Sequence, residues 1–592
     1  MNVSDAVIRF LEEIGLGHVF TLSGGGIMYL LDSLGRSKKL RYVCNYHEQA
    51  CAIAADGYAR VNGFGVCFVT TGPGAVNALS GVVGAWYDSI PMLVVSGQVR
   101  SNLVADYSKV RQIGPQEGNV IEIARPVTKY AVSLHDPKMI LFELEKAHNI
   151  AKFGRPGPVW LELPLDMQAA EVEWHALPRW SAKPRQAKDL EALHISEVVT
   201  SLKAAKRPVL VLGNGVRLAG MQETALKLVA KLRIPTLLPY TGKDLVDQKN
   251  PYSFGVFGTS GQRHSNIILQ NSDLILGLGV GFSLAKTGFE VKKFALDAKK
   301  IIVDIDPGQL NEHHLQADIS ILSDLRDFLP ALLDALKPHK INCESWSKLC
   351  EFWEGRYPVI IPEFFADGSY INSYVFMDTL SNLASEGDVI VTGNGLDCIS
   401  FYQGYKIKAG QRSILNGNWG SMGWDLPTAV GAHYATGDRI LCITGDGSLM
   451  LNCQELLTIG ANKLPVKVFV FNNGGYGSIK ATQNNFFKGR FVGCGPSSNV
   501  YNPNFSDLAK AFGLSYKKIS NHSSLSDLLE SVLREEGPFI CEVMISPDQW
   551  ITPKATSFKN SEGQIESKLL DDMAPFLSDQ EIEENRCLAR AI

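Results

Sequence analysis

The sequence predicts an α/β protein made of three doubly wound parallel-sheet domains. Short, nearly continuous hydrophobic runs alternate with longer stretches of helical periodicity, as expected for strands that helices cover on both faces. The chain has 592 residues. Because domains typically contain roughly 100–200 residues, a chain of this length predicts several cores rather than one.

The predicted domains follow one another without a sequence repeat. They span residues 1–170, 190–335 and 355–555, and a polar linker that contains proline separates the first two. A polar, acidic tail at 556–592 is expected either to cap a site or to fray. The predicted strands lie at 40–45, 65–70, 91–97, 207–214, 272–279, 300–307, 388–395, 439–447 and 466–475.

Composition argues against several functional classes. The formal net charge is −4, and no Lys/Arg stripe carries interleaved aromatic residues, so we expect no nucleic-acid partner. No uncharged apolar stretch reaches the ~18 residues of a membrane span, and the acidic N-terminus does not resemble a secretory signal. The eleven cysteines form no CxxC pair, so we predict reduced thiols and a cytoplasmic location.

The strongest chemical signal lies where two consecutive predicted strands of the third domain end. One strand ends at Gly445-Asp446-Gly447-Ser448 and the next at Asn472-Asn473-Gly474-Gly475. Ligands of open α/β sheets bind beyond such strand ends, where glycine lets the backbone approach a phosphate. The Asp446 carboxylate, the Asn473 side chain and the Gly475 carbonyl offer the hard oxygen ligands that Mg²⁺ prefers. A lone Asp in a glycine turn would indicate only an Asx turn, but two such turns favour a metal-bridged diphosphate.

This GDGS…NN arrangement resembles the diphosphate-binding signature of thiamine-diphosphate enzymes. The upstream segment Gly420-Ser421-Met422-Gly423 is similar to the family's aminopyrimidine-binding segment. There the methionine wedges under the cofactor and holds it folded, although Met422 alone would be read as a gap-filling core residue. The resemblance also places Gly395 and Ile479 in the cofactor site.

The first domain supplies the candidate activating acid, Glu48. It opens a predicted helix, where a lone glutamate would merely be favoured by the helix N-terminus. The segments at 70–81, 88–99 and 154–166 resemble the pyrimidine-binding domain of the acetolactate synthase family, in the family's order. The resemblance extends to the central FAD/ADP-type domain and the diphosphate-binding domain. It implies that Glu48 bonds to the cofactor's pyrimidine ring and activates the thiazolium carbon, which attacks a 2-keto acid.

Further site candidates come from the same resemblance. They are Gly24 and Gly25 in a glycine-rich turn, Gln116 lining the pocket and Lys129 at its edge. His47 is placed to relay protons, although a packed histidine fits the pattern equally well. In this family Glu48 of one subunit faces the GDGS…NN motifs of another, so the resemblance implies a homodimer or homotetramer.

The sequence departs from acetolactate synthases beside the predicted acceptor. Pro115 stands where the family usually has Phe, and Thr482 stands where it usually has a bulky Trp. An aromatic side chain buries about 150–250 Å², so both changes predict a larger acceptor pocket. We therefore predict a carboligase that decarboxylates a 2-keto acid such as pyruvate and transfers the two-carbon unit to a ketone-type acceptor. One branch of the family suggests a nucleotide-linked keto-deoxysugar.

Several alternatives stay open. The chain could be a true acetolactate synthase with a second 2-keto acid as acceptor, or a simple 2-keto acid decarboxylase or oxidase. A non-catalytic relative kept for binding is a third alternative, against which Glu48, Asp446 and Asn473 argue. FAD is an additional candidate cofactor, because the central glycine turns resemble a flavin site while Gly281 and Ala285 replace the arginines of the synthases.

Overall fold

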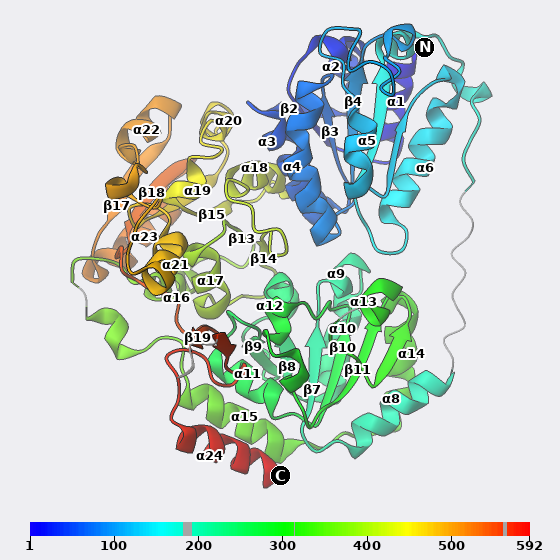
Figure 1. The fold of residues 1–592 in the computed structure, drawn as a ribbon. Coiled ribbons are helices and arrows are strands. Elements are labelled where there is room, and N and C mark those ends of the chain that lie inside the picture. The colour runs from blue at the N-terminus through cyan, green and yellow to red at the C-terminus, as the bar shows by residue number, and fades with distance from the viewer. Residues whose placement is uncertain (182–191, 313, 367, 560–564) are drawn as a thin grey trace.

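The computed structural model contains three six-stranded parallel sheets and one two-stranded antiparallel ribbon (Figure 1). This confirms the predicted fold class. All nine predicted strands are present, and their ends differ from the prediction by at most three residues. Residue 190, where the second predicted domain starts, lies outside the described residues, as does part of the preceding linker. The described residues are 1–181, 192–312, 314–366, 368–559 and 565–592.

The first sheet has the strand order β2-β1-β3-β4-β6-β5. Its central strands are completely buried, which explains their continuous hydrophobic sequences. The strands are β1 (His18–Thr21), β2 (Arg41–Cys44), β3 (Gly65–Val69), β4 (Met92–Gln98), β5 (Tyr130–Ser133) and β6 (Val159–Pro164). The helices are α1 (Val3–Glu13), α2 (Met28–Arg36), α3 (Glu48–Asn62), α4 (Pro73–Asp88), α5 (Val120–Ala124), α6 (Ile140–Lys152) and α7 (Leu165–Ala169).

The third sheet repeats this topology, with the order β14-β13-β15-β16-β18-β17. Both outer sheets therefore place their first, third and fourth strands side by side. The strands are β13 (Val389–Thr392), β14 (Arg412–Ile414), β15 (Ile440–Gly445), β16 (Val466–Asn472), β17 (Ser515–Ile519) and β18 (Phe539–Met544). The helices are α16 (Ser373–Leu383), α17 (Leu396–Gly404), α18 (Asp425–Thr436), α19 (Asp446–Leu449), α20 (Glu455–Ala461), α21 (Gly477–Phe487), α22 (Phe505–Phe512) and α23 (Leu525–Arg534).

The central sheet has a different order, β12-β11-β10-β7-β8-β9. Chain order reverses between β7 and β10, as in dinucleotide-binding folds, which creates a crevice beyond the carboxyl ends of these strands. The strands are β7 (Pro208–Leu212), β8 (Thr236–Leu238), β9 (Ser253–Val256), β10 (Leu274–Leu278), β11 (Lys299–Asp304) and β12 (Ile319–Leu322). The helices are α8 (Ala192–Ala204), α9 (Gly215–Leu218), α10 (Gln222–Leu232), α11 (Arg263–Gln270), α12 (Leu284–Thr287), α13 (Pro307–Asn311), α14 (Leu325–Leu336) and α15 (Glu344–Arg356).

Helices α3 and α18 join the first and third sheets within one chain (Figure 1). Two glycines let their backbones touch: a Cβ atom on Gly57 would lie 2.8 Å from the Thr428 carbonyl oxygen, and one on Gly431 would lie 1.9 Å from that of Ala54. The buried Trp424 indole donates to Asp56 at 3.0 Å across the same contact. The two outer units therefore pack as closely as helices within one core.

The tail is docked on the central unit. Helix α24 (Asp579–Arg590) packs against α15, where the Trp353 indole donates to Asn585 at 2.9 Å. The antiparallel strands β19 (Ser557–Lys559) and β20 (Ile565–Ser567) precede it, and residues 560–564 between them lie outside the described part. The described part of the tail is therefore packed rather than frayed.

The cysteines and helices bear on two further expectations. All eleven cysteines are free thiols, and eight of them are buried. Among the described residues, no helix combines the length and apolar character required to cross a membrane.

Candidate active site

The Asp446 carboxylate lies at the carboxyl end of β15 and is almost completely buried. One of its oxygens accepts from the Gly447 amide at 2.7 Å. The other accepts from the amides of Gly474 and Gly475 at 2.8 and 2.9 Å. Burial raises the pKa of Asp446 and these hydrogen bonds oppose the rise. The two predicted turns therefore meet at one carboxylate, and a cation there would offset the cost of burying it.

Asn502 completes this turn and was not predicted from the sequence. Its amide nitrogen donates to Asp446 at 2.6 Å and to the Asn472 side chain at 3.3 Å. Asn473 and Gly475 follow the end of β16, beside β15. Among the described residues, no three His, Cys, Asp or Glu side chains form a metal cluster. One carboxylate with amide and carbonyl oxygens would not form such a cluster, yet it is the oxygen-rich set that Mg²⁺ accepts.

The glycine segments predicted upstream reach the same edge of the sheet. Gly395 follows β13, the neighbour of β15, and caps α17 with a φ of 136° that only glycine adopts readily. Gly420 accepts from the Asn394 side chain at 2.6 Å. The Gly423 amide donates at 2.8 Å to the hydroxyl of Ser448, directly after the GDG turn. The structure thus brings together the loops that follow β13, β15 and β16, and Met422 lies half-buried between Gly420 and Gly423.

The GDGS turn leads into two short helices rather than one. A single turn, α19, is separated from helix α20 by residues 450–454. The Asn452 side chain lies in the break and donates to the Gly423 carbonyl at 2.6 Å. The break therefore fastens the Met422 loop to the Asp446 turn.

Helix α21 carries Ile479 and Thr482, and both side chains are exposed. No residue of this eleven-residue helix is buried. The Thr482 hydroxyl donates back to the Ser478 carbonyl at 3.0 Å. Phe486 and Phe487 at its end are also half exposed. Helix α21 therefore exposes Ile479, Phe486 and Phe487 together with polar side chains in the single chain.

Glu48 is the first residue of α3 and is 8% exposed. The Asn77 amide donates to its Oε2 at 3.1 Å. Its Oε1 faces the first turn of α4, where a Cβ atom on Gly74 would lie only 2.9 Å away. Asn77 therefore holds one carboxylate oxygen of Glu48, and the other lies beside the first turn of α4.

The glycine-rich turn and Gln116 lie near Glu48 at the same end of the first sheet. A Cβ atom on Gly24 would lie 2.4 Å from Thr70, whose methyl group is also 2.7 Å from the Cβ position of Gly74. Gly25 opens a short 3-10 helix directly after Gly24. Gln116 is exposed, has a φ of 62°, and follows the equally exposed Pro115. Gly24 and Gly25 follow β1, whereas Gln116 lies on the loop after β4, where its carbonyl oxygen is 1.8 Å from the Cβ position of Gly72.

The structure does not bring Lys129 to this group. Lys129 precedes β5 and lies at the amino end of the sheet, where its ammonium donates to the Phe153 carbonyl at 2.5 Å. Burial lowers its pKa to about 8. His47 does adjoin Glu48, but its Nδ1 accepts from the Gln49 amide at 3.0 Å and caps α3. Only its Nε2 is left to exchange a proton with a ligand.

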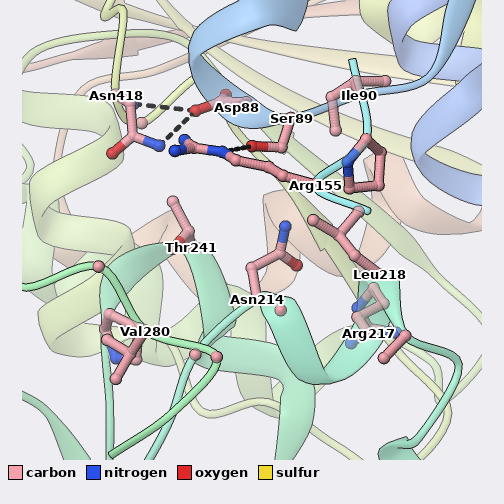
Figure 2. Close-up of a pocket in the computed structure, with 18 of the residues that line it drawn as sticks. Asp88, Ser89, Ile90, Arg155, Asn214, Arg217, Leu218, Thr241, Val280 and Asn418 are labelled. Carbon is pink, nitrogen blue, oxygen red and sulfur yellow. Dashed lines mark hydrogen bonds between the residues drawn. The ribbon is translucent and has the colours of Figure 1, made fainter. Parts of the chain in front are cut away.

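A cavity of about 980 Å³ lies where the three units meet, apart from the site residues described so far. Its walls include the glycine turns after β7 and β10: a Cβ atom on Gly213 would lie 2.1 Å from the Gly279 carbonyl oxygen. Figure 2 shows Asp88 and Arg155 of the first unit across from Asn214 of the central unit. Small-molecule sites span roughly 300–1,000 Å³, so this crevice has room for a ligand of dinucleotide size.

A neighbouring side chain lies in front of one of the two central positions that lack the expected arginines. A Cβ atom on Gly281 would lie 2.4 Å from the Gln309 side-chain oxygen, so Gln309 occupies the space in front of position 281. The Ala285 carbonyl accepts from the Thr259 amide at 2.8 Å. Asp304 at the end of β11 lines the cavity, and burial raises its pKa. Glycine turns and an acidic residue at a neighbouring strand end fit a nucleotide ligand.

A glycine-lined edge with a buried carboxylate, a buried glutamate on a second α/β unit and a nucleotide-type third unit define a class of enzymes that bind a diphosphate cofactor. Comparison with known families gives three matches of that class. The thiamine pyrophosphate enzyme N-terminal TPP-binding domain matches residues 1–121, the central domain 195–332 and the C-terminal TPP-binding domain 394–543.

Individual relatives agree with the family match. The acetolactate synthase isozyme 1 large subunit of Escherichia coli (strain K12) is 30% identical over 93% of this chain and 95% of its own. A probable acetolactate synthase large subunit of Methanococcus aeolicus is 31% identical over 92% of both chains. Acetolactate synthase 2, chloroplastic, of Nicotiana tabacum is 29% identical over 94% of this chain and 83% of its own. The chain belongs to the thiamine pyrophosphate enzyme family and is a thiamine-diphosphate-dependent, acetolactate synthase-like enzyme.

Proposed function

We propose that this enzyme decarboxylates a 2-keto acid such as pyruvate and transfers the two-carbon unit to a ketone-type acceptor. The observation that carries the proposal is the meeting of the turns after β15 and β16 at the buried Asp446 carboxylate, with the loop after β13 at the same edge of the sheet. When bound, thiamine diphosphate supplies a thiazolium that accepts the electron pair released by decarboxylation. Similarity to acetolactate synthases supports carboligation as the outcome.

Glu48 is proposed to control the proton on the cofactor's pyrimidine ring. Asn77 holds its Oε2, so Oε1 is left to accept a hydrogen bond from a ring nitrogen. Gln116, exposed on its loop, is proposed to orient the substrate.

Mg²⁺ is proposed to bridge the diphosphate and the Asp446 turn. The residues that would hold it are Asp446, the Asn473 side chain and the Gly475 carbonyl. Met422, Gly395, Gly420 and Ile479 are proposed to line the rest of the cofactor site. Asn502 is proposed to orient the Asp446 carboxylate, since groups behind metal ligands commonly fix their direction.

We propose that each complete site forms between two copies of the chain. In one chain the Glu48 carboxylate bonds to Asn77, and α21, which exposes Ile479, has no buried residue. Subunit mixing tests this. Glu48→Gln and Asp446→Ala variants, each inactive alone, should regain about a quarter of wild-type activity when co-refolded, because half of the dimers are mixed and each has one intact site. No recovery would show that each chain contains its own site.

The acceptor is proposed to be larger or more polar than a 2-keto acid, with a nucleotide-linked keto-deoxysugar as the candidate. Support comes from the exposed Thr482 and Pro115, neither of which narrows the entrance as an aromatic residue would. Pyruvate should be supplied with keto sugars or a second 2-keto acid, and the coupled products identified by mass. A Thr482→Trp variant should favour the smaller acceptor, and an unchanged preference would exclude position 482 as the selector.

We propose that the central cavity holds a dinucleotide of the FAD type. The strand order, the Gly213 and Gly279 turns and Asp304 support a nucleotide there. The chromophore released from purified protein would identify a flavin. Acetaldehyde or peroxide without a coupled product would instead favour the decarboxylase or oxidase alternative. The eleven free thiols support a reducing, cytoplasmic location.

A further inference from the structure

Lys286 is a buried lysine in the wall of the central cavity. It lies in α12, beyond the Gly279 turn, and is 5% exposed. Its ammonium nitrogen lies 5.4 Å from the centre of the Tyr240 ring, on the loop after β8. Within the described residues, this ammonium makes no hydrogen bond or ion pair. Burying an ammonium without such a partner is costly, so its surroundings call for an anion.

The arginines of the cavity wall, in contrast, each form an ion pair with a carboxylate. Arg60 bonds to Asp56 and Asp88, and Arg217 and Arg412 share Asp244. Arg155 pairs with Asp306, and Arg326 with Asp324. Lys152 also lines the cavity, but its side chain is exposed to solvent. Lys286 is thus the buried cation of this wall that forms no ion pair with a carboxylate of the described residues, although Asp88 is near enough to act on it electrostatically.

We propose that Lys286 binds the diphosphate of the nucleotide in the central cavity. The inference rests on the proposed nucleotide site and specifies which residue of this chain supplies its charge. The helix after the Gly213 turn, α9, has only four residues, so the turn itself provides few aligned amides. The arginine positions 281 and 285 carry no charge in this chain. A side-chain cation from α12 therefore supplies what the turns lack.

Asp304 and Lys286 are expected to bind different parts of the nucleotide, its ribose and its diphosphate. Asp304 ends β11, on one side of the β7–β10 crevice, and an acidic residue at that place commonly accepts from a ribose hydroxyl. Lys286 contacts Tyr240 after β8, on the other side of the crevice. Loss of Lys286 should therefore weaken the binding of phosphate groups without weakening that of the nucleoside.

Equilibrium binding separates these contributions. Adenosine, ADP and FAD should be titrated into the full-length protein by calorimetry, with and without thiamine diphosphate. Lys286→Met should weaken ADP and FAD binding by roughly 10- to 100-fold and change adenosine binding by less than about twofold, as for loss of a charge-assisted contact. Lys286→Arg should recover most of the ADP affinity. The matched control, Lys152→Met, should change ADP affinity by less than about threefold.

The outcomes are distinct. Equal affinity of wild type and Lys286→Met for ADP would overturn the proposal, as would equal weakening of ADP and adenosine. Weakening confined to FAD would place Lys286 against the flavin half and would also overturn it. Folding is checked by thermal unfolding of each variant. Decarboxylation of pyruvate is assayed in parallel, so failure of the proposed reaction is recognised independently of nucleotide binding.

Discussion

The Asp446 turn and the central cavity are two proposed phosphate sites that solve the same electrostatic problem differently. At the Asp446 turn the chain provides a carboxylate and backbone amides, and the proposed metal ion supplies the positive charge. In the central cavity the buried ammonium of Lys286 supplies it. At equivalent strand ends, the positive charge that binds a phosphate can therefore come either from a metal ion or from a side chain of the protein.

The topologies of the two regions account for this difference. In the third sheet, β15 and β16 are neighbours, so the turns that follow them meet at Asp446 and can hold a metal ion. In the central sheet, chain order reverses between β7 and β10, which leaves an elongated crevice. An elongated crevice contacts its ligand at several points. Lys286 of α12 is proposed to contact only the diphosphate.

The largest expected effect changes the Asp446 site and leaves the central cavity unchanged. Asp446→Ala should lower decarboxylation by more than about 1,000-fold, because both the metal and the diphosphate lose their anchor. ADP binding to the central cavity should stay within about twofold of wild type. Turnover and ADP calorimetry on the same preparation check both statements. A parallel loss of ADP binding would mean that the sites are structurally coupled.

Glu48→Gln should lower kcat by about 100- to 10,000-fold, the range for loss of a positioned acid or base. Thiamine diphosphate should still bind, because the diphosphate turn is unchanged. Asn77→Ala, which removes the partner of Glu48 Oε2, serves as the matched control and should lower kcat by less. The measurement is stopped-flow decarboxylation at saturating cofactor. A larger loss in Asn77→Ala than in Glu48→Gln would contradict the assignment.

Removal of the metal ion should affect the Asp446 site and leave the central cavity unchanged. Chelation by EDTA should weaken thiamine diphosphate binding by roughly 100-fold or more, while ADP binding to the central cavity should not change. Calorimetry before and after dialysis against the chelator measures both. Restoration by Mg²⁺ would exclude irreversible unfolding, and a chelator-sensitive ADP affinity would erase the proposed distinction.

Asn502→Ala should weaken Mg²⁺ affinity by roughly 10- to 100-fold, as expected when a group that orients a metal ligand is removed. The Asn504→Ala variant is a suitable comparison, because Asn504 caps α22 through the Ser506 amide and makes no described contact with Asp446. Mg²⁺ titration of cofactor binding is the assay. Equal effects of the two variants would show that Asn502 acts through loop folding alone.

pH should affect the central cavity with a predictable sign. Burial lowers the pKa of Lys286 to about 8; Asp88 opposes this shift and Arg155 adds to it. The charged form prevails below pH 8 and binds the diphosphate, so ADP affinity should fall above pH 8, by up to about tenfold at pH 9. Adenosine should show no such fall. The same pH series with Lys286→Met should be flat.

The sequence predicts most of the proposed cofactor site because its motifs are local. Asp446 and Asn473 each follow a hydrophobic strand, and adjacent parallel strands end at one edge. Glu48 is found the same way, after β2. These residues need no knowledge of distant contacts beyond the strand order.

The remaining features depend on contacts between distant segments. Asn502 reaches Asp446 from a loop 56 residues later that has no periodic pattern. Gln309 fills the space at position 281 from beyond β11, and Lys286 has no motif around it. Lys129 is predicted at the edge of the pocket, but the local sequence does not reveal that it lies at the amino end of its sheet.

Helix α21 would link catalysis to protein concentration if a second copy of the chain covers it. An isolated helix of this length is marginal in water, and no residue of α21 is buried in the single chain. Its first residue follows Gly475 by two positions, so fraying would reach the Asp446 turn. If a second copy covers this helix, dilution below the dissociation constant of the assembly must unravel the site before it unfolds the core. Specific activity should then fall at nanomolar enzyme and return with a lag on concentration.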